Sequence, residues 1–459
     1  MVIASLLTCL CCGGESAEPI TVRVKHRHSE KEWRRYETTL LAHLKDFDPA
    51  PVKRSRYGGR LDRKEAATGF FEVRPTDHGW VMVDPEGCHF FSVGVNSTQP
   101  NDTRPDHAAA FAKTFSGRAD WAKKTKSLLV DDLQFNSLGC WSDWSTFREA
   151  GVKMPYVRRW NLMASYGRKK GLTFKKYGHA GFRHGVLPVF DQAFAEHVDQ
   201  VCKAMAETRD DPWLIGHFTD NELPFKSRDI LSRYLKAPAD SASHQAARAF
   251  LAEKGIGAEE ITRAHDTAFA GRVIKTYYRT VHDAIRRHDP NHLILGSRLH
   301  GRASTQDICY TASGPFVDVV SINYYHRWTP RPEELNRRAK LAKKPLLITE
   351  WYAKGADSGL DNSKGAGFTV PTQEDRGRFY ENFTLGLLKN RNVVGWHWFR
   401  YIDDGDHKTG GHSANKGLLD LNFEPHEGLT ESMRAINGAV YSLADRFRAV
   451  DRVGSAEGE

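Results

Sequence analysis

Short apolar runs alternate with amphipathic segments from residue 69 to the end of the chain. Each run is apolar almost throughout, which is typical of strands that are covered on both faces. The segments between them carry apolar residues at helical spacing, as in 191–211 and 272–290. Eight runs are predicted as buried strands: 89–96 (HFFSVGVN), 135–141 (FNSLGCW), 154–162 (MPYVRRWNL), 213–219 (WLIGHFT), 292–298 (HLILGSR), 317–325 (VDVVSINYY), 345–351 (PLLITEW) and 393–401 (VVGWHWFRY).

Strands that alternate with helices predict a parallel sheet, because each helix carries the chain back to the edge where it started. Eight repeats within residues 69–459 fit a (β/α)8 TIM barrel with insertions better than a doubly wound sheet. No G-x-G-x-x-G motif follows a strand, which argues against a dinucleotide-binding fold. The predicted fold class is therefore α/β, with residues 69–459 forming the barrel.

The N-terminal residues are expected to form separate parts. Residues 1–17 are apolar and end in small residues, which predicts a signal peptide and a secreted or periplasmic protein. The positively charged start of such peptides is missing, so an apolar N-terminus on a cytoplasmic protein is the alternative. Residues 18–68 are charged and poorly periodic, and form an extension that packs on or beside the barrel or is partly disordered. The histidines within 26–28 are predicted to be surface residues. Runs at 70–75 and 80–87 flank a turn and predict a β-hairpin before the first strand.

Charge and cysteine usage add few constraints. The 459 residues include 66 Lys and Arg against 57 Asp and Glu, a net charge of +9. These basic residues are scattered and no nucleic-acid module appears, so we expect a solvated basic surface and no nucleic-acid partner. Four of the seven cysteines are isolated and are predicted to be buried thiols, although one disulfide is an alternative. No stretch after the N-terminus is long and apolar enough to span a membrane.

The residues that close the predicted strands suit a sugar site. Barrel enzymes place their active sites at the carboxyl ends of the strands. Aromatic rings stack on pyranose faces, while amides and carboxylates bond sugar hydroxyls. The residues predicted to contact substrate at these ends are Asn96, Trp141, Asn221, Arg298, His300, Tyr324, Tyr325, Trp351 and Trp398.

Two carboxylates at strand ends have the pattern of a glycosidase. Glu222 follows the fourth strand and Glu350 ends the seventh, so they can face each other across the barrel mouth. Cleavage of a glycosidic bond needs one carboxylic acid to protonate the leaving oxygen and a second carboxylate to attack the anomeric carbon or to activate water. A single glutamate at a strand end is commonly an ordinary surface residue, whereas two glutamates that face each other across the barrel mouth are not. Asp220 competes with Glu222 for the acid role, because side chains two apart on a strand share a face.

The chain resembles glycoside hydrolase family 50, the β-agarases. The resemblance is carried by GWVMVDPEGCHFFSVGVN, FNSLGCWSDW, HFTDNELPF, ITEWYAKGADSGLDN, GAGFTVPTQEDRGRFYENFTLGLL and VGWHWFRYIDD, which lie between residues 69 and 417. It implies a retaining, metal-independent enzyme without a cofactor that cleaves β-1,4 galactosidic bonds in agarose. Exo action with neoagarobiose-type products is also implied.

The resemblance also assigns roles to single residues. It implies that Glu222 is the acid/base and Glu350 the nucleophile. Asn221 would bond the 2-hydroxyl of the sugar at the cleavage site, and Tyr324 or Tyr325 would keep the nucleophile ionised. Trp398 would form a platform for a sugar ring.

Other functions remain open at this stage. Family members often carry a large N-terminal β-rich domain, whereas only residues 1–68 precede this barrel, so tight polymer binding is not expected. The basic loop at 166–187 raises the alternative of a β-galactosidase-type enzyme on a sulfated galactan, although a solvated loop is the simpler interpretation. A catalytically silent carbohydrate-binding barrel and a nucleic-acid-binding protein are further alternatives.

Overall fold

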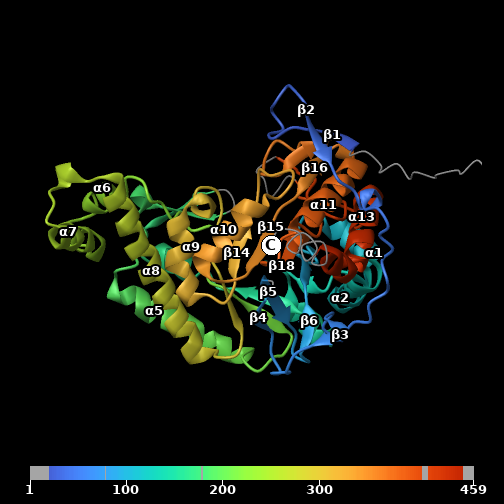
Figure 1. The fold of residues 1–459 in the computed structure, drawn as a ribbon, viewed down its shortest axis with the longest axis horizontal. Helices are drawn as coiled ribbons and strands as arrows, with labels where there is room; N and C mark the ends of the chain where they lie inside the picture. The colour runs from blue at the N-terminus through green and yellow to red at the C-terminus, as the bar shows by residue number, and fades with distance from the viewer. Residues whose placement is uncertain (1–19, 78, 177–178, 406–411, 448–459) are drawn as a thin grey trace, which may run out of the picture.

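Eight parallel strands form a closed barrel at the centre of the computed structural model, which describes residues 20–77, 79–176, 179–405 and 412–447 (Figure 1). The strands pair in chain order, and a parallel bridge between Leu299 and Ile322 joins β13 to β14 and closes the ring. This confirms the predicted (β/α)8 barrel. The barrel strands are β7 (Ser92–Val95), β8 (Ser137–Leu138), β9 (Tyr156–Arg159), β12 (Leu214–Phe218), β13 (Leu293–Gly296), β14 (Val320–Asn323), β15 (Leu346–Glu350) and β18 (Val393–Trp398).

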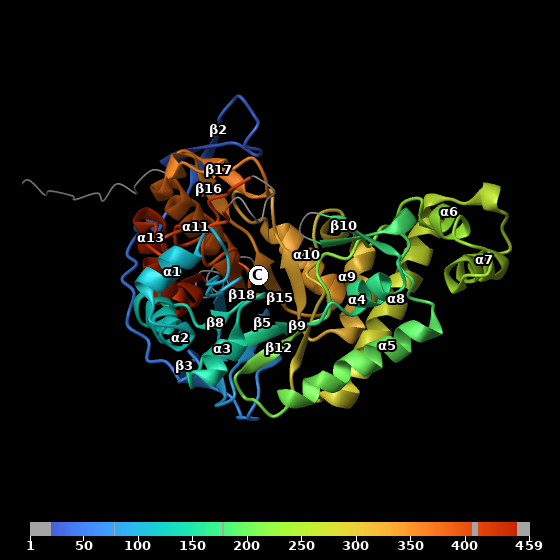
Figure 2. The same cartoon turned by 180° about the vertical axis from the view of Figure 1, so that it is seen from behind.

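Helices surround the strands and cover their outer faces (Figures 1 and 2). They include α1 (Ala108–Thr114), α2 (Arg118–Lys126), α3 (Trp144–Glu149), α4 (Leu162–Lys169), α5 (Gln192–Cys202), α8 (Arg263–His288), α9 (Asp307–Ser313), α10 (Pro332–Ala342), α11 (Gln373–Leu388) and α13 (Glu427–Gly438). Helix α8 begins earlier than the helix predicted at 272–290. Its first turn is stabilised by Thr262, whose side chain accepts a hydrogen bond from the backbone N–H of His265.

The segment at 226–270 contains two further helices that project from the barrel beside α8, namely α6 (Ile230–Leu235) and α7 (Ala242–Lys254) (Figure 1).

A small antiparallel sheet closes the barrel at the amino ends of its strands. It has the order β3–β6–β5–β4 and contains the predicted hairpin. Its buried Phe71, Met82 and Phe90 pack against barrel-interior side chains such as Ile215 and Leu347. One end of the barrel is therefore filled, and only the carboxyl ends of the strands remain for a site. The strands of this sheet are β3 (Arg60–Lys64), β4 (Glu72–Thr76), β5 (Gly79–Val83) and β6 (Cys88–Phe90).

The N-terminal extension forms a hairpin of β1 (Ile20–Val24) and β2 (Arg34–Thr38). The backbones of Lys25 and Thr369 exchange two hydrogen bonds of 2.8 and 2.9 Å, which fixes the hairpin to β17 (Phe368–Val370). The Trp328 indole also donates a hydrogen bond of 2.9 Å to the Thr38 hydroxyl. The hairpin thus lies over the loops that follow β14 and β15, on the open side of the barrel.

Three smaller findings bear on the sequence predictions. The segment at 166–187, expected to be a loop, contains an antiparallel hairpin of β10 (Thr173–Lys176) and β11 (His179–Phe182). Four buried cysteines are free thiols: Cys88, Cys140, Cys202 and Cys309. The predicted signal peptide at 1–17 lies outside the described residues. Within the described ranges, no helix has the length and apolar character needed to cross a membrane.

Candidate active site

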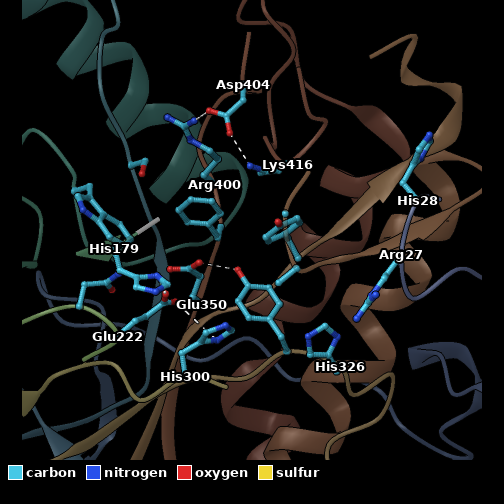
Figure 3. A pocket seen from close by; sticks show the side chains of 18 of the residues that line it. Arg27, His28, His179, Glu222, His300, His326, Glu350, Arg400, Asp404 and Lys416 are labelled. Carbon is cyan, nitrogen blue, oxygen red and sulfur yellow. Dashed lines mark hydrogen bonds and ion pairs between the residues drawn. The ribbon is translucent and has the colours of Figure 1, made fainter. Parts of the chain in front are cut away.

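A cavity of about 680 Å³ opens at the carboxyl ends of the barrel strands. Its volume suits a ligand of a few sugar rings. Six of the eleven residues predicted for the site line it: Trp141, Asn221, Glu222, His300, Tyr325 and Glu350. Figure 3 shows the two glutamates close together at one side of this cavity, with His179 and His300 next to Glu222.

Glu350 is surrounded by hydrogen-bond donors that favour its ionised form. The Tyr325 hydroxyl donates a bond of 2.7 Å to Oε1, and the Arg298 guanidinium forms an ion pair with Oε2. The Asn323 amide nitrogen lies 3.3 Å from the same Oε2. Three donors in a buried site hold the carboxylate in one orientation and stabilise its ionised form against the effect of burial. This is the state that a nucleophile requires.

Glu222 has a different set of neighbours. The Asn323 amide donates a bond of 2.8 Å to Oε1, and His179 Nδ1 lies 3.0 Å from Oε2. His300 Nδ1 is farther away, at 3.8 Å from Oε1. Hydrogen bonds and charge from these neighbours change how readily Glu222 takes up a proton. The protonation of Glu222 is therefore adjustable, as the acid/base step of glycoside cleavage requires.

Asn323 contacts both carboxylates and so limits their separation. Its Nδ2 is 2.8 Å from Glu222 Oε1 and 3.3 Å from Glu350 Oε2, so the distance between these two oxygens cannot exceed the sum of the two contacts. Retaining enzymes hold their carboxyl groups roughly 5 to 5.5 Å apart, whereas inverting enzymes need about 6.5 to 9.5 Å. For this one pair of oxygens, the upper limit that Asn323 sets lies below the inverting range.

The pKa values of the two glutamates shift in opposite directions. Burial raises the pKa of Glu350, opposed by the Arg298 guanidinium and reinforced by the charge of Glu222. Burial also raises the pKa of Glu222, but His179, His300 and Asn323 together bring it below its ordinary value. The two carboxyls titrate as a pair. Without sugar bound, these directions favour the proton on Glu350, so the assignment of the acid and the nucleophile rests on hydrogen-bond geometry and not on these shifts.

Arg298 lies beneath the cavity and holds several of its residues in place. Its side chain is fully buried and does not line the cavity. Its Nε donates a bond of 2.8 Å to Asn221 Oδ1, and its guanidinium lies 4.5 Å from the centre of the Trp141 ring. Arg298 thus links Glu350 to two residues that do face the cavity. This corrects its predicted role as a direct substrate contact.

No model of a known protein family matches the chain. The chain is similar to β-agarase B of Vibrio sp. (strain JT0107), with 26% identity over 503 residues that cover 85% of this chain and 50% of that protein. It is also similar to β-agarase A of the same strain, with 24% identity over 524 residues, 90% of this chain and 52% of that protein. The chain therefore spans about half the length of the curated relatives it matches.

The crystal structure of BpGH50 has a TM-score of 0.83 to this chain at 30% identity, and covers 95% of this chain and 98% of that one. The chain belongs to glycoside hydrolase family 50. This confirms the family predicted from the sequence motifs. Agarase AgWH50C shares the fold (TM-score 0.68, 22% identity, 86% of this chain and 67% of that one). So does an exo-β-agarase (TM-score 0.71, 21% identity, 86% and 68%).

Two tryptophans predicted for this family 50 site are not at the cavity. Trp398 is fully buried and its indole donates a bond of 3.1 Å to the Lys416 carbonyl. Trp351 is also buried, stacked 4.2 Å from the Phe383 ring of α11. Side chains alternate along a strand, so Trp398 points to the helix layer, whereas the next residue, Phe399, lines the cavity. The predicted sugar platform at Trp398 is thus corrected.

Asn96 and Tyr324 also lie outside the cavity of the family 50 barrel. Asn96 is buried; its amide nitrogen donates to the Thr349 carbonyl at 2.9 Å, and its oxygen accepts from the Cys140 N–H at 2.8 Å. Asn96 therefore links the end of β7 to β15 and to the segment after β8, and its side chain does not line the cavity. Tyr324 donates a bond of 3.2 Å to Glu334 on α10, which faces away from the cavity. Of the two tyrosines considered, only Tyr325 contacts Glu350.

Asp220, the alternative acid, is fully buried beneath the site. Its carboxyl accepts bonds from the N–H groups of Met163 and Ala164 at 2.8 and 3.0 Å, at the start of α4. Tyr277 donates a third bond of 2.7 Å. Burial raises the pKa of Asp220 to about 6 despite these donors. Asp220 therefore anchors a helix to the end of β12 and has no access to substrate.

Several cavity residues of this family 50 chain were not predicted. His179 comes from the β10–β11 hairpin, and no sequence pattern links it to Glu222. The segment at 26–28, predicted to lie on the surface, reaches the cavity wall because the β1–β2 hairpin is fixed to β17. Further unpredicted lining residues are Ser29, Ser97, Gln99, His326, Tyr352, Ser363, Gly365, Ala366, Phe399, Arg400, Asp404 and Lys416.

One buried cluster, His217, Asp289 and His292, has the composition of a metal site. Its polar atoms are already hydrogen-bonded. His217 Nδ1 accepts from the Trp160 indole at 3.0 Å, and both imidazoles lie 2.8 Å from Asp289 Oδ2. His292 Nε2 faces the Asp211 carbonyl at 2.9 Å. Burial raises the pKa of Asp289, but the two histidines hold it well below its usual range. We interpret the cluster as a structural hydrogen-bond network.

Proposed function

We propose that this chain is a retaining β-agarase-type hydrolase that cleaves β-1,4 galactosidic bonds in agarose or neoagaro-oligosaccharides. The observation that carries the proposal is the placement of Glu222 and Glu350 on one cavity wall, bridged by Asn323. The names of its relatives among the Vibrio β-agarases support the choice of substrate. Exo action, with neoagarobiose-type products, is part of the proposal because the family resemblance implies it.

The first step is attack by a Glu350 oxygen on the anomeric carbon. A bond forms between that carbon and Glu350, while the bond to the leaving oxygen breaks and that oxygen takes the Glu222 proton. Tyr325 and Arg298 keep Glu350 ionised and oriented before the attack. Asn221, held by Arg298, would bond the sugar at the cleavage site, where a contact to the 2-hydroxyl strengthens in the transition state.

The second step releases the sugar. Glu222, now a carboxylate, removes a proton from water, and the water oxygen bonds to the anomeric carbon as the bond to Glu350 breaks. The configuration of the anomeric carbon is inverted twice and so retained. The limit on the distance between the two glutamate oxygens, set by their contacts of 2.8 and 3.3 Å to Asn323, supports this route over a single inversion by water.

The decisive experiment is incubation of the full chain with agarose and with neoagaro-oligosaccharides, followed by product analysis and by NMR of the first anomer released. We expect neoagaro-type products in the β configuration. Glu350→Gln should abolish turnover while leaving binding intact, and Glu424→Gln, which removes an exposed carboxylate outside the cavity, should leave turnover unchanged. A folded chain that binds these sugars without cleaving them would instead be a silent carbohydrate-binding barrel.

Secretion is proposed from residues 1–17 alone. Fractionation of cells that express the full chain, with sequencing of the N-terminus of the exported protein, tests it. Recovery of the chain in the cytoplasm with residues 1–17 retained would contradict the prediction.

A further inference from the structure

The outer end of the cavity is basic. Arg27 and His28 of the β1–β2 loop line it together with His326, which follows the nucleophile-binding Tyr325 directly in sequence. Figure 3 shows these three side chains on the side of the cavity remote from His179. A neutral galactan offers only hydroxyl groups and ring faces, so it gives no reason for several basic side chains at this position.

The acidic groups of the cavity do not neutralise this end. Glu350 is paired with Arg298, and Glu222 lies against His179. Asp404 is paired with both Arg400 and Lys416 (Figure 3). Each carboxylate is therefore already engaged with its own basic partners.

Among the described residues, the Arg27 guanidinium has no ion-pair partner, and the buried Nδ1 of His28 has no hydrogen-bond partner. Burial lowers the pKa of His326, and the basic neighbours His300, His26 and Arg27 lower it further. Burial and two lysines lower the pKa of His28, against a smaller opposing effect of Asp361. The carboxylate of Asp361 is itself hydrogen-bonded to Ser363 and His412. Arg27 therefore carries the positive charge at this end, and the two imidazoles offer hydrogen-bonding groups. The nearby Glu30 carboxylate is engaged by the His26 backbone N–H at 3.2 Å and by Arg34 at 3.7 Å.

The β1–β2 loop, which carries Arg27 and His28, is held in place. Lys25 is bonded through its backbone to Thr369, and the His26 ring lies 2.5 Å from the Tyr36 hydroxyl and packs edge-on against Phe368 at 5.0 Å. A basic group presented on a fixed loop loses little conformational freedom when it binds an anion.

We propose that Arg27, His28 and His326 form a subsite for a negatively charged substituent of the substrate, a sulfate ester or a carboxylate. Arginine and histidine donors match the oxygens of such groups. The proposal rests on the proposed function for the galactan backbone and adds a charged group to it. The charge recognition then involves the N-terminal hairpin and not the basic segment at 166–187, which had raised a sulfated galactan as an alternative.

The test measures binding by calorimetry in the Glu350→Gln background, so that no ligand is consumed. The ligands are a sulfated galacto-oligosaccharide, the same compound after desulfation, and a galacturonate-containing analogue. We expect the best charged ligand to bind roughly fivefold more tightly than the neutral one, since the ion pair between Arg27 and the charged group is partly exposed to solvent. The two charged ligands distinguish a sulfate site from a carboxylate site.

Two variants of the same hairpin make the test specific. Arg27→Ala should remove the preference for charge, and Arg27→Glu should reverse it. Arg35→Ala removes an exposed charge from the paired strand, outside the cavity, and should leave the preference intact. Equal affinity for charged and neutral ligands, or a preference that survives Arg27→Ala, would overturn the subsite.

The failure of the proposed function has a different signature. It is a lack of turnover of every galactan, charged or neutral, by the unaltered chain. Cleavage of neutral and charged substrates with equal kcat/KM would leave the hydrolase in place and remove only the anion subsite.

Discussion

The hydroxyl of Tyr325 provides the sharpest test of how Glu350, the proposed nucleophile, is held and ionised. Tyr325→Phe removes the donor that lies 2.7 Å from Glu350 Oε1. The ring itself should stay in place, because it packs edge-on between His300 at 5.5 Å and Tyr352 at 5.4 Å. The substitution therefore changes one hydrogen bond and little else.

A hydrogen bond to a charged group contributes about 1.5 to 3 kcal/mol, which corresponds to a roughly 10- to 150-fold fall in kcat/KM. We expect the lower part of this range, because the Arg298 ion pair and the Asn323 contact to Oε2 remain. The Tyr325 hydroxyl also lowers the pKa of Glu350. Without it this pKa rises, so the acidic limb of the pH profile should move to higher pH.

The assay is the pH dependence of kcat/KM on a neoagaro-oligosaccharide. Tyr324→Phe is the matched control, because its hydroxyl bonds Glu334 outside the cavity and its loss should change neither rate nor pH profile. A Tyr325→Phe enzyme with less than a threefold loss and an unmoved acidic limb would refute the role assigned to this hydroxyl.

Three further predictions concern the acid catalyst, the cavity wall and the buried cluster. His179→Ala removes a group that lowers the pKa of Glu222, so the basic limb of kcat should move to higher pH; an unchanged limb would mean that His179 does not control this proton. Phe399→Ala should raise KM about three- to tenfold with little loss of stability. Trp398→Phe should lower the free energy of unfolding in urea by about 1 to 3 kcal/mol and leave KM unchanged. The opposite result would restore Trp398 as the sugar platform. Asp289→Asn should destabilise the fold by about 3 to 5 kcal/mol, because it leaves two buried imidazoles without their carboxylate. The folded-state pKa of Asp289 is depressed, so its contribution to the free energy of unfolding is present above about pH 4 and is lost as the pH falls below this value. The variant should therefore lose less stability in acid than the unaltered protein. Parallel plots of stability against pH for the two proteins would contradict the assignment.

The barrel was determined by local patterns in the sequence. Eight apolar runs of strand length, each followed by a helical segment, allow few architectures other than a (β/α)8 barrel. In this fold every strand end meets the same mouth, so Glu222 and Glu350 could be located from the sequence. The motifs around them were specific enough to predict family 50.

Tertiary structure decided which strand-end residues face the cavity. Trp398 and Phe399 are adjacent and both aromatic, and only the orientation of the strand end sends one to the helices and the other to the cavity. Likewise Arg298, a strand-end residue, is buried under Glu350 instead of facing substrate. A single-residue difference in orientation is not encoded in the apolar pattern, because both residues are compatible with a buried strand.

Contacts between distant segments could not be predicted from the sequence either. His179 approaches Glu222 only because the β10–β11 hairpin folds over the barrel mouth. Arg27 reaches the cavity because two backbone hydrogen bonds join Lys25, near the start of the chain, to Thr369 in the loop region after the seventh barrel strand. Backbone hydrogen bonds of this kind do not depend on side-chain identity, so they leave no recognisable pattern in the residues that they connect. The sequence alone therefore determined the barrel and its two glutamates, and the tertiary structure decided the surroundings that set their charge and shape the rest of the cavity.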